Sequence, residues 1–238
     1  MKIKKSLFSD FIKESALSGE FVLREVKLDF SDKGLIITSA TLDNSCMVKA
    51  QIPSSSFEDY SEIGKIAILN YSELLKIVST LNDDIYIQKE GNVLILKGGR
   101  KVEIPLADVT AIRDISKVPN LEYDISFVTN KQFFDEINNN LSFSLNSSDS
   151  ATVLFTGVNK KLIAKYGTKY KFEDKLDVES IPNSDNDLPL EVKFGKIFFD
   201  AIANIKGDIQ VSLKSEYPAT IIKKTDMYAL KIIIAPKV

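Results

Sequence analysis

The sequence contains no histidine and no tryptophan, and its 238 residues include a single cysteine, Cys46. Without histidine the chain can form no Ser-His or Cys-His nucleophile pair, no histidine metal site and no imidazole proton shuttle. A single cysteine excludes an internal disulfide and argues against a cysteine-based zinc site. No apolar run approaches the roughly 20 residues of a membrane-spanning helix, and the first residues lack a signal-peptide core. We therefore expect an intracellular protein with no membrane partner, no metal and no cofactor.

Carboxylate or lysine chemistry remains open after these absences, but the motifs for it are weak. The closest acidic pairs, Asp83 with Asp84 and Asp185 with Asp187, lie where turns are expected. No phosphate-binding glycine motif occurs, because Gly98 and Gly99 stand between two alternating stretches and predict a hairpin turn. The sequence therefore disfavours an enzyme.

The chain contains 44% apolar and 27% charged residues, which is typical of a globular protein, and its pattern predicts two copies of one plan. Residues 1–110 predict the order strand, helix, four strands, helix, three strands, and residues 123–238 repeat it. When the two copies are aligned with an offset of 124 residues, Phe198 matches Leu74 and Ile209 matches Ile85. A helix, its turn and the next strand then align without a gap. Within the second copy we expect a strand at 141–145 and a long loop at 171–188.

These observations predict an α+β fold of two similar domains, each with antiparallel sheets backed by two helices. The domains would be residues 1–110 and 123–238. Residues 111–122 join them, show neither helical nor strand periodicity and include Pro119, so they predict a connector. The competing interpretation is two unrelated α+β pieces that share a common period.

The polar face of each predicted helix carries a lysine, mostly beside short neutral side chains. Solvated surface is the ordinary interpretation. If identical subunits closed into a ring with these helices inward, the lysines would line a hole that could hold nucleic-acid phosphates without reading bases. Asp10, Asp135 and Asp200 would dilute that field. The candidate DNA-facing residues are Lys13, Lys76, Lys131, Lys196 and Lys206.

With this organisation the sequence resembles the DNA sliding clamps of the proliferating cell nuclear antigen (PCNA) family. The resemblance is carried by the duplicated plan, by Val118-Pro119 and Tyr123 around the connector, and by the C-terminal stretch IIIAPKV at 232–238. Three further stretches are similar to segments of the family: 38–53 to a loop and strand, 70–87 to the second helix and following strand, and 215–224 to the penultimate turn and strand. The resemblance covers the whole chain in order.

The resemblance implies a homotrimeric ring that encircles duplex DNA, tethers DNA polymerase and other replication and repair enzymes, and is opened by a separate clamp loader. Residues 101–109 of one subunit would pair antiparallel with about 160–166 of the next. The implied subunit-interface residues are Val102, Ile104, Leu106, Leu162, Ala164 and Tyr166. The location would be at DNA, with nucleus and cytoplasm not distinguished.

The family's partners insert a peptide with apolar anchors into a groove beside the connector, which we expect to be mobile when empty. The groove residues that the resemblance implies are Leu42, Cys46, Met47, Ile115, Val118, Pro119, Pro218, Ile233, Ala235 and Pro236. Two other functions stay open. One is a monomeric or hetero-oligomeric processivity subunit that binds DNA on one basic face, and the other is a β-rich viral or structural assembly protein that never meets DNA.

Overall fold

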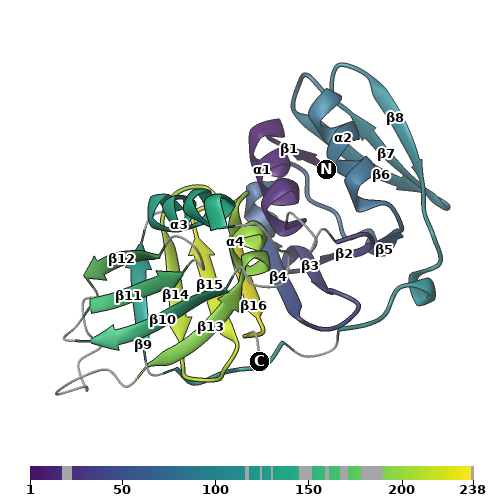
Figure 1. Cartoon of the computed structure of the whole chain (residues 1–238). Coiled ribbons are helices and arrows are strands. Elements are labelled where there is room, and N and C mark those ends of the chain that lie inside the picture. The colour runs from purple at the N-terminus through teal and green to yellow at the C-terminus, as the bar shows by residue number, and fades with distance from the viewer. Residues whose placement is uncertain are drawn as a thin grey trace. The chain divides into compact units, whose positions relative to one another are not determined.

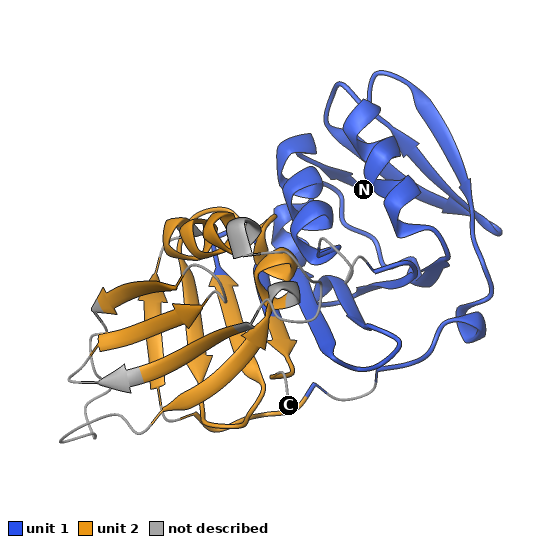
Figure 2. Cartoon of the chain, viewed as in Figure 1, with its two compact units in different colours: residues 1–17, 22–118, 224–231 blue, residues 18–21, 119–223, 232–238 orange. Residues whose placement is uncertain are grey.

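The computed structural model of the chain describes residues 1–17, 23–115, 118–123, 125–129, 131–144, 152–158, 161–166, 171–177 and 190–236. These residues form two compact units, coloured separately in Figure 2. Unit 1 consists of the described parts of 1–118 together with 224–231, and unit 2 of the described parts of 119–223 together with 232–236.

Unit 1 contains two helices and two antiparallel sheets (Figure 1). Helix α1 (Lys5–Ser15) packs against helix α2 (Tyr71–Thr80) and against strand β4. One sheet has the order β1-β6-β7-β8, with bounds Lys2–Ile3, Ile85–Glu90, Val93–Lys97 and Lys101–Pro105. The other strands run in the order β5-β2-β3-β4, with bounds Gly64–Ile68, Val26–Ser31, Gly34–Ala40 and Cys46–Ile52. Short 3-10 helices occur at Ser54–Ser56 and Val109–Ala111.

Unit 2 is built from the same parts. Helix α3 (Lys131–Ser144) packs against helix α4 (Lys196–Ile202). One sheet has the order β12-β11-β10-β13, with bounds Phe172–Asp177, Lys161–Tyr166, Thr152–Val158 and Glu191–Gly195. The remaining strands run in the order β16-β15-β14-β9, with bounds Ala229–Ile234, Ala219–Lys224, Ile209–Leu213 and Ile125–Thr129. Of these residues, Lys224 and the first half of β16 (229–231) are grouped with unit 1.

The two units repeat one topology. Adding eight to each strand number turns β1-β6-β7-β8 into β9-β14-β15-β16, and β5-β2-β3-β4 into β13-β10-β11-β12, which are the observed neighbour orders. The offset of 124 found in the sequence carries Ile85, the first residue of β6, onto Ile209, the first residue of β14. The prediction of two similar α+β domains with antiparallel sheets and two helices each is therefore confirmed.

The helices form where the sequence pattern places them. In α1 the apolar residues at helical spacing, Leu7, Phe8, Phe11 and Ile12, are all buried. The first turn of α2 is capped by Asn70, whose side-chain oxygen accepts a hydrogen bond from the Glu73 backbone N–H at 3.1 Å. Helices α1 and α2 thus each have a buried apolar face and a polar face with exposed side chains.

Gly34 begins strand β3 at a turn that no other residue type fits. Its φ of +102° lies in the left-handed region, and a Cβ there would lie 2.1 Å from the Ile52 carbonyl oxygen. The backbone of β3 can therefore approach the end of β4 closely, which sets the register of this hairpin.

The core of unit 2 is dominated by phenylalanine. Five rings come from α3, α4, β10 and β13, and each is buried: Phe134, Phe155, Phe194, Phe198 and Phe199. Phe198 lies at the centre, with ring centroids 4.5 Å from Phe194 and 5.1 Å from Phe199. Such aromatic contacts add to the stabilisation that burial provides.

Two predictions about unit 2 were wrong. Residues 141–144 belong to helix α3, because Leu141 lies one helical turn after Ile137 and both side chains are buried in the same apolar stripe. Residues 172–177, predicted as loop, form strand β12, which pairs with β11 from Lys161↔Asp177 to Tyr166↔Phe172. Charged residues hide this strand in the sequence because it contains few apolar positions. Residues 178–188 lie outside the described part of the chain.

Candidate functional site

The predicted DNA-facing lysines lie within helices or shortly after one. Lys13 lies exposed in the last turn of α1, Lys76 is exposed in α2, and Lys206 is exposed shortly after α4. Lys131 and Lys196 are the first residues of α3 and α4, and their side chains lie outside the described atoms. Each unit thus has predicted DNA-facing lysines within or next to its pair of helices.

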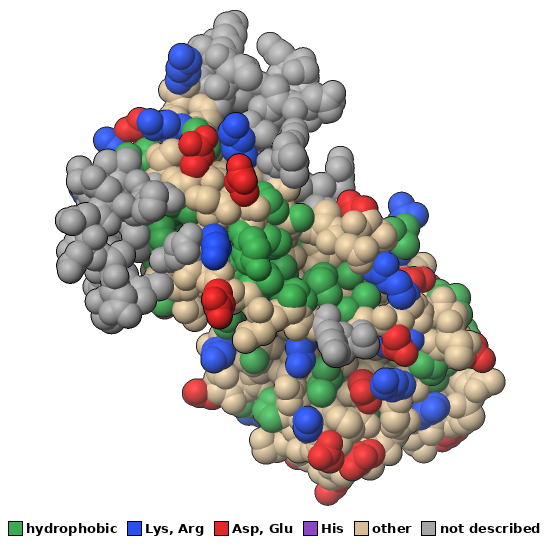
Figure 3. Space-filling view, turned by 90° about the horizontal axis from the view of Figure 1, so that it is seen from below, with side chains coloured by type: hydrophobic (Ala, Val, Ile, Leu, Met, Phe, Trp, Pro, Cys, Tyr) green, Lys and Arg blue, Asp and Glu red, His purple; other side chains and the backbone are tan. Residues whose placement is uncertain are grey.

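The charge around these lysines is mixed. Asp10 on α1, Asp135 on α3 and Asp200 on α4 are each half-buried, and the chain has a formal charge of −2. On the face seen from below in Figure 3, which is not the face on which Figure 1 draws helices α1, α2 and α3, basic and acidic side chains are likewise interspersed. A single chain of this kind has only a weak attraction for phosphates.

Of the two strands predicted to form the subunit interface, one is an outer strand of its sheet and the other is an interior strand. Strand β8, with Val102 and Ile104, is the last strand of its sheet. Strand β11 is interior, because β12 covers it on one side and β10 on the other. Leu162 and Ala164 are also completely buried. Strand β12 is an outer strand of this sheet, and Leu106 lies half-buried just after β8.

Tyr166, also predicted to contact the next subunit, instead holds β12 in place. Its ring stacks on Phe172 with centroids 5.2 Å apart. Its hydroxyl donates a hydrogen bond to Asp174 and accepts one from Asn140 Nδ2 at 2.9 Å. Burial and the hydrogen bond to Asp174 raise the pKa of this hydroxyl well above its ordinary value. Tyr166 therefore links β12 to helix α3.

Residues 41–45 form a compact loop that presents Leu42 to solvent. The Leu42 side chain is 86% exposed. Asp43 accepts hydrogen bonds from Thr41 Oγ1 at 2.7 Å and Ser45 Oγ at 2.6 Å, and these bonds lower its pKa to about 2. Arg113 Nη2 donates to Asn44 Oδ1 at 2.7 Å. This network was not predicted from the sequence, although Thr-x-Asp-x-Ser spacing is typical of a turn closed by side chains.

The first part of the connector is anchored to unit 1. Ile112 is buried, and Lys27 Nζ donates to Asp114 Oδ1 at 2.8 Å. The Lys27 side chain is only 9% exposed, so Asp114 satisfies an ammonium group that would otherwise be buried without a partner. The same bond lowers the pKa of Asp114. Beyond it, Ile115 and Val118 are partly exposed and Pro119 is exposed.

Two residues of the predicted peptide groove cannot line it. Cys46 is 0% exposed and Ile233 is 5% exposed. Cys46 faces the interior in the alternating burial pattern of β4, and Ile233 belongs to a run of three buried isoleucines in β16. Burial also raises the pKa of the Cys46 thiol to about 12, which leaves it unreactive. Of the other residues predicted to line the groove, Ala235 is exposed. Met47, Pro218 and Pro236 are partly exposed.

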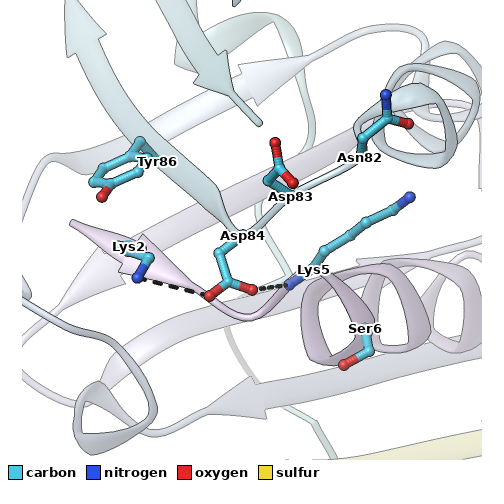
Figure 4. Close-up of a pocket in the computed structure, with 7 residues that line it drawn as sticks. All are labelled: Lys2, Lys5, Ser6, Asn82, Asp83, Asp84 and Tyr86. Atoms are coloured by element: carbon cyan, nitrogen blue, oxygen red, sulfur yellow. Dashed lines mark hydrogen bonds and ion pairs between the residues drawn. The ribbon is translucent and has the colours of Figure 1, made fainter. Parts of the chain in front are cut away.

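A polar hollow of about 500 Å³ lies beside the start of α1 (Figure 4). Lys2 Nζ lies 3.1 Å from Glu58 Oε2 and 3.6 Å from Asp84 Oδ2. The Asp84 carboxylate also accepts the Lys5 backbone N–H at 3.4 Å, at the first turn of the helix. The hydrogen bond to Glu58 raises the pKa of Lys2, so this lysine stays protonated and is a poor nucleophile. The hollow therefore offers structural ion pairs rather than catalysis.

Within the described residues, no group of three or more acidic or cysteine side chains is arranged to hold a metal ion. Of the helices described, none is long and apolar enough to cross a membrane.

Comparison with known sequences identifies DNA clamps. No protein-family model matches the chain. It is 29% identical over 134 residues to a DNA polymerase sliding clamp of Methanosarcina mazei, a match that spans 53% of the chain and 54%, about half, of that clamp. It is 25% identical to a probable DNA polymerase sliding clamp of Paramecium bursaria Chlorella virus 1, over 98% of the chain and 92% of that protein.

Comparison with solved structures gives the fold. A. fulgidus PCNA, solved with the C-terminal region of FEN-1, has a TM-score of 0.81 at 17% identity and matches 100% of the chain. PCNA from Entamoeba histolytica gives 0.81 at 17% identity, and the PCNA2-PCNA3 complex from Sulfolobus tokodaii gives 0.76 at 16%. The comparisons cover 97%, 98% and 99% of the respective solved chains.

Proposed function

We propose that this chain, which has the fold of the PCNA sliding clamps over its whole length and resembles two clamps in sequence, is itself a DNA sliding clamp. It would be a non-enzymatic processivity factor that encircles duplex DNA inside the cell and tethers replication and repair enzymes to it. The observation that carries this proposal is the full-length match to clamp structures, at a TM-score of 0.81. The repeat of one strand order in the two units supports it further.

We propose that each chain has two similar domains, residues 1–110 and 123–238, joined by the connector 111–122. The ring would be assembled from these domains. A head-to-tail contact that rotates by a third of a turn closes with three copies and generates six domains around a hole. The outer strands β8 and β12 are the natural places for that contact, since outer strands invite pairing with another chain. The solved PCNA2-PCNA3 complex is an assembly of PCNA chains, which supports an oligomer here. We propose a homotrimer.

DNA would be held by linkage rather than by tight binding. In a closed ring the proposed DNA-facing residues, Lys13, Lys76, Lys131, Lys196 and Lys206, would contact phosphates without reading sequence. The mixed charge near them keeps the attraction weak, which allows sliding. Because the ring cannot slip off sideways, a tethered polymerase keeps a high effective concentration at its template. Opening the ring would require a separate ATP-driven clamp loader.

The topological link can be tested directly. The protein is loaded with its clamp loader onto nicked circular DNA, free protein is removed, and retention is measured by gel filtration. We expect retention on the circle and rapid loss after a restriction enzyme makes one cut, unless bulky groups block both ends. Equal retention on circular and unblocked linear DNA would contradict encirclement. Together with a monomeric mass by light scattering, it would support a subunit that binds DNA on one face.

We also propose that partner proteins dock near the connector. The support is that A. fulgidus PCNA was solved with the C-terminal region of FEN-1, and that this chain exposes apolar side chains on ordered loops. Leu42 stands on the loop closed by Asp43, and Val118 follows the anchored residue Asp114. Partly exposed Met47 and Ile115 extend the apolar surface, and methionine adapts to different partners.

Replacing Leu42 and Val118 together by glutamate should weaken binding of a fluorescent peptide with the FEN-1 C-terminal sequence by about tenfold or more, because apolar anchors contribute much of such affinities. Fluorescence anisotropy measures the change. Val128→Glu is the matched control, since Val128 is 71% exposed on β9. An unchanged dissociation constant in the double variant, with the same oligomeric state, would move the peptide site elsewhere.

A further inference from the structure

We propose that Arg113 positions the partner-docking surface by fastening the loop that carries Leu42 to the start of the connector. Arg113 contacts no partner itself. It fixes where the exposed Leu42 side chain stands relative to Ile115 before a peptide arrives. This inference rests on the proposed docking of partners near the connector, and it adds to that proposal a residue outside the predicted groove.

The loop at 41–46 is closed at its base by its own hydrogen bonds. The Thr41 N–H donates to the Cys46 carbonyl at 2.9 Å, and the Cys46 N–H donates to Thr41 Oγ1 at 3.0 Å. Asn44 has a φ of +59°, a left-handed conformation that asparagine adopts more readily than most residues. Its N–H donates to the Thr41 carbonyl at 3.0 Å. The loop therefore has a shape of its own, from which Leu42 projects with 86% of its side chain exposed.

The start of the connector is held independently on both sides of Arg113. Ile112, the residue before it, is only 6% exposed. Asp114, the residue after it, accepts the hydrogen bond from Lys27 Nζ at 2.8 Å. The Arg113 backbone is thus fixed by its two neighbours, while its own side chain is exposed. Such a residue can reach a second loop without moving the connector.

The Arg113 side chain joins these two fixed segments. Its Nη2 donates to Asn44 Oδ1 at 2.7 Å and to the Thr41 carbonyl at 3.4 Å. Because that carbonyl also accepts the Asn44 N–H, the guanidinium binds the atoms that define the turn of the loop. A guanidinium holds its N–H donors in one rigid plane, so it loses less freedom per hydrogen bond than a flexible ammonium group would. The loop and the connector therefore present their apolar side chains as one surface.

Positioning of this kind affects binding more than folding. An exposed hydrogen bond contributes little to the free energy of folding, because water replaces it readily. A partner that must first order a loose loop binds more weakly, since the cost of ordering is subtracted from the binding free energy. Without Arg113 the Leu42 side chain stays exposed, but its loop can move against the connector. A variant without Arg113 should therefore fold normally and bind partners more weakly.

The competing role for Arg113 is a direct contact with a carboxylate of the partner, because the side chain is exposed. The two roles differ in how Arg113 and Asn44 combine. If Arg113 acts through Asn44, either substitution breaks the same bond, and removing both has no larger effect than removing one. If Arg113 contacts the partner, the two effects are independent and the losses of affinity multiply.

A double-mutant cycle with the fluorescent FEN-1 C-terminal peptide separates the two roles. We expect Arg113→Ala and Asn44→Gly each to raise the dissociation constant about fivefold, and the double variant to raise it about fivefold as well. Glycine is used at position 44 because it accepts the positive φ. Asn44→Asp keeps an oxygen acceptor and tolerates the same φ, so it should bind the peptide like the wild type.

Arg100→Ala is the matched control. Arg100 is also exposed, and its Nη2 donates to the Thr80 carbonyl at 2.6 Å, at the end of α2. The substitution removes the same charge and the same kind of bond from a different part of unit 1. It should leave the affinity for the peptide unchanged. The thermal unfolding midpoint of each variant confirms that the protein is folded.

Amide hydrogen exchange adds a measurement that a direct contact would not change. In the free protein, Arg113→Ala should speed the exchange of the Asn44 and Cys46 amides, because their loop is no longer fastened. Bound peptide should return both rates toward those of the wild type. Arg100→Ala should leave both rates unchanged.

Three results would overturn the positioning role. They are an unchanged affinity of Arg113→Ala, losses that multiply in the double variant, or unchanged exchange at 41–46 in the free Arg113→Ala protein. Each leaves the docking proposal standing if the joint replacement of Leu42 and Val118 by glutamate still weakens binding. A wild-type protein that does not bind the peptide at all would overturn the docking proposal and the positioning role together.

Discussion

Phe198→Ala is expected to lower the free energy of unfolding of unit 2 by about 3–5 kcal/mol. Phe198 is 0% exposed and touches rings from two strands and two helices. Truncation removes the transfer free energy of the ring and leaves a cavity that the four surrounding rings cannot fill. Helix α4 spans only Lys196–Ile202, so it depends on this anchor more than a long helix would. Urea unfolding combined with amide hydrogen exchange in β10 and β13 measures the loss.

Two further substitutions serve as controls for this result, a conservative one at Phe198 and one at an exposed position outside the aromatic cluster. Phe198→Leu keeps most of the volume and should cost about 1.5 kcal/mol or less. Val128→Ala, at an exposed position of β9, should stay within about 0.5 kcal/mol of the wild type. If Phe198→Ala were as stable as Val128→Ala, the aromatic cluster would not be the core of unit 2. The exchange rates of unit 1 amides should change much less than those of unit 2.

Reversing Lys13, Lys76 and Lys206 to glutamate together should reduce processive DNA synthesis at least about tenfold at low salt. The change moves the formal charge of the chain from −2 to −8, because three reversals subtract six charges. All three lysines are exposed, and in a closed ring the new carboxylates would repel phosphates in the hole instead of attracting them. Primer extension with a trapped polymerase measures product length.

A second triple variant separates local contact from net charge. Lys33, Lys89 and Lys97 are exposed in a turn and on strands β6 and β7, away from the helices. Reversing them gives the same net charge but should leave product length near that of the wild type. Equal losses in both variants would mean that overall charge, and not a helix-lined hole, controls DNA contact. Raising the salt should narrow the difference, because counterions screen phosphate contacts.

Most of the architecture could be predicted from hydrophobic periodicity. The helical stripe from Leu7 to Ile12, the alternation at the start of β6 and the apolar run of β7 depend on local backbone geometry, so they are visible in the sequence. The repeat was visible because the 124-residue offset preserves the phase of a helix and its following strand. Strand β12 was missed because it has only Phe172 and Leu176 as apolar residues. Residues 141–144 were misassigned because they alternate leucine or phenylalanine with serine, a pattern typical of a strand, although they continue helix α3.

The candidate functional sites were harder to predict from the sequence than the helices and strands. Cys46 and Ile233 are apolar residues near exposed loops, and the sequence alone does not show that both face the interior. The anchoring of the connector by Lys27 and Asp114 joins residues 87 positions apart, and such a pair leaves no local pattern. Likewise, the network that joins Arg113 to the loop at Asn44 depends on which segments the fold brings together.

The sequence by itself determined that the chain lacks histidine chemistry and disulfides, that it contains two copies of an α+β plan, and where most helices and strands lie. These properties depend on composition and on neighbours within a few residues. Only the tertiary structure decided that β12 and not β11 is the outer strand, that Tyr166 holds it, and that Asp114 anchors the connector. The physical reason is that a strand becomes an outer strand, and a side chain becomes buried, through what distant segments supply or fail to supply beside it.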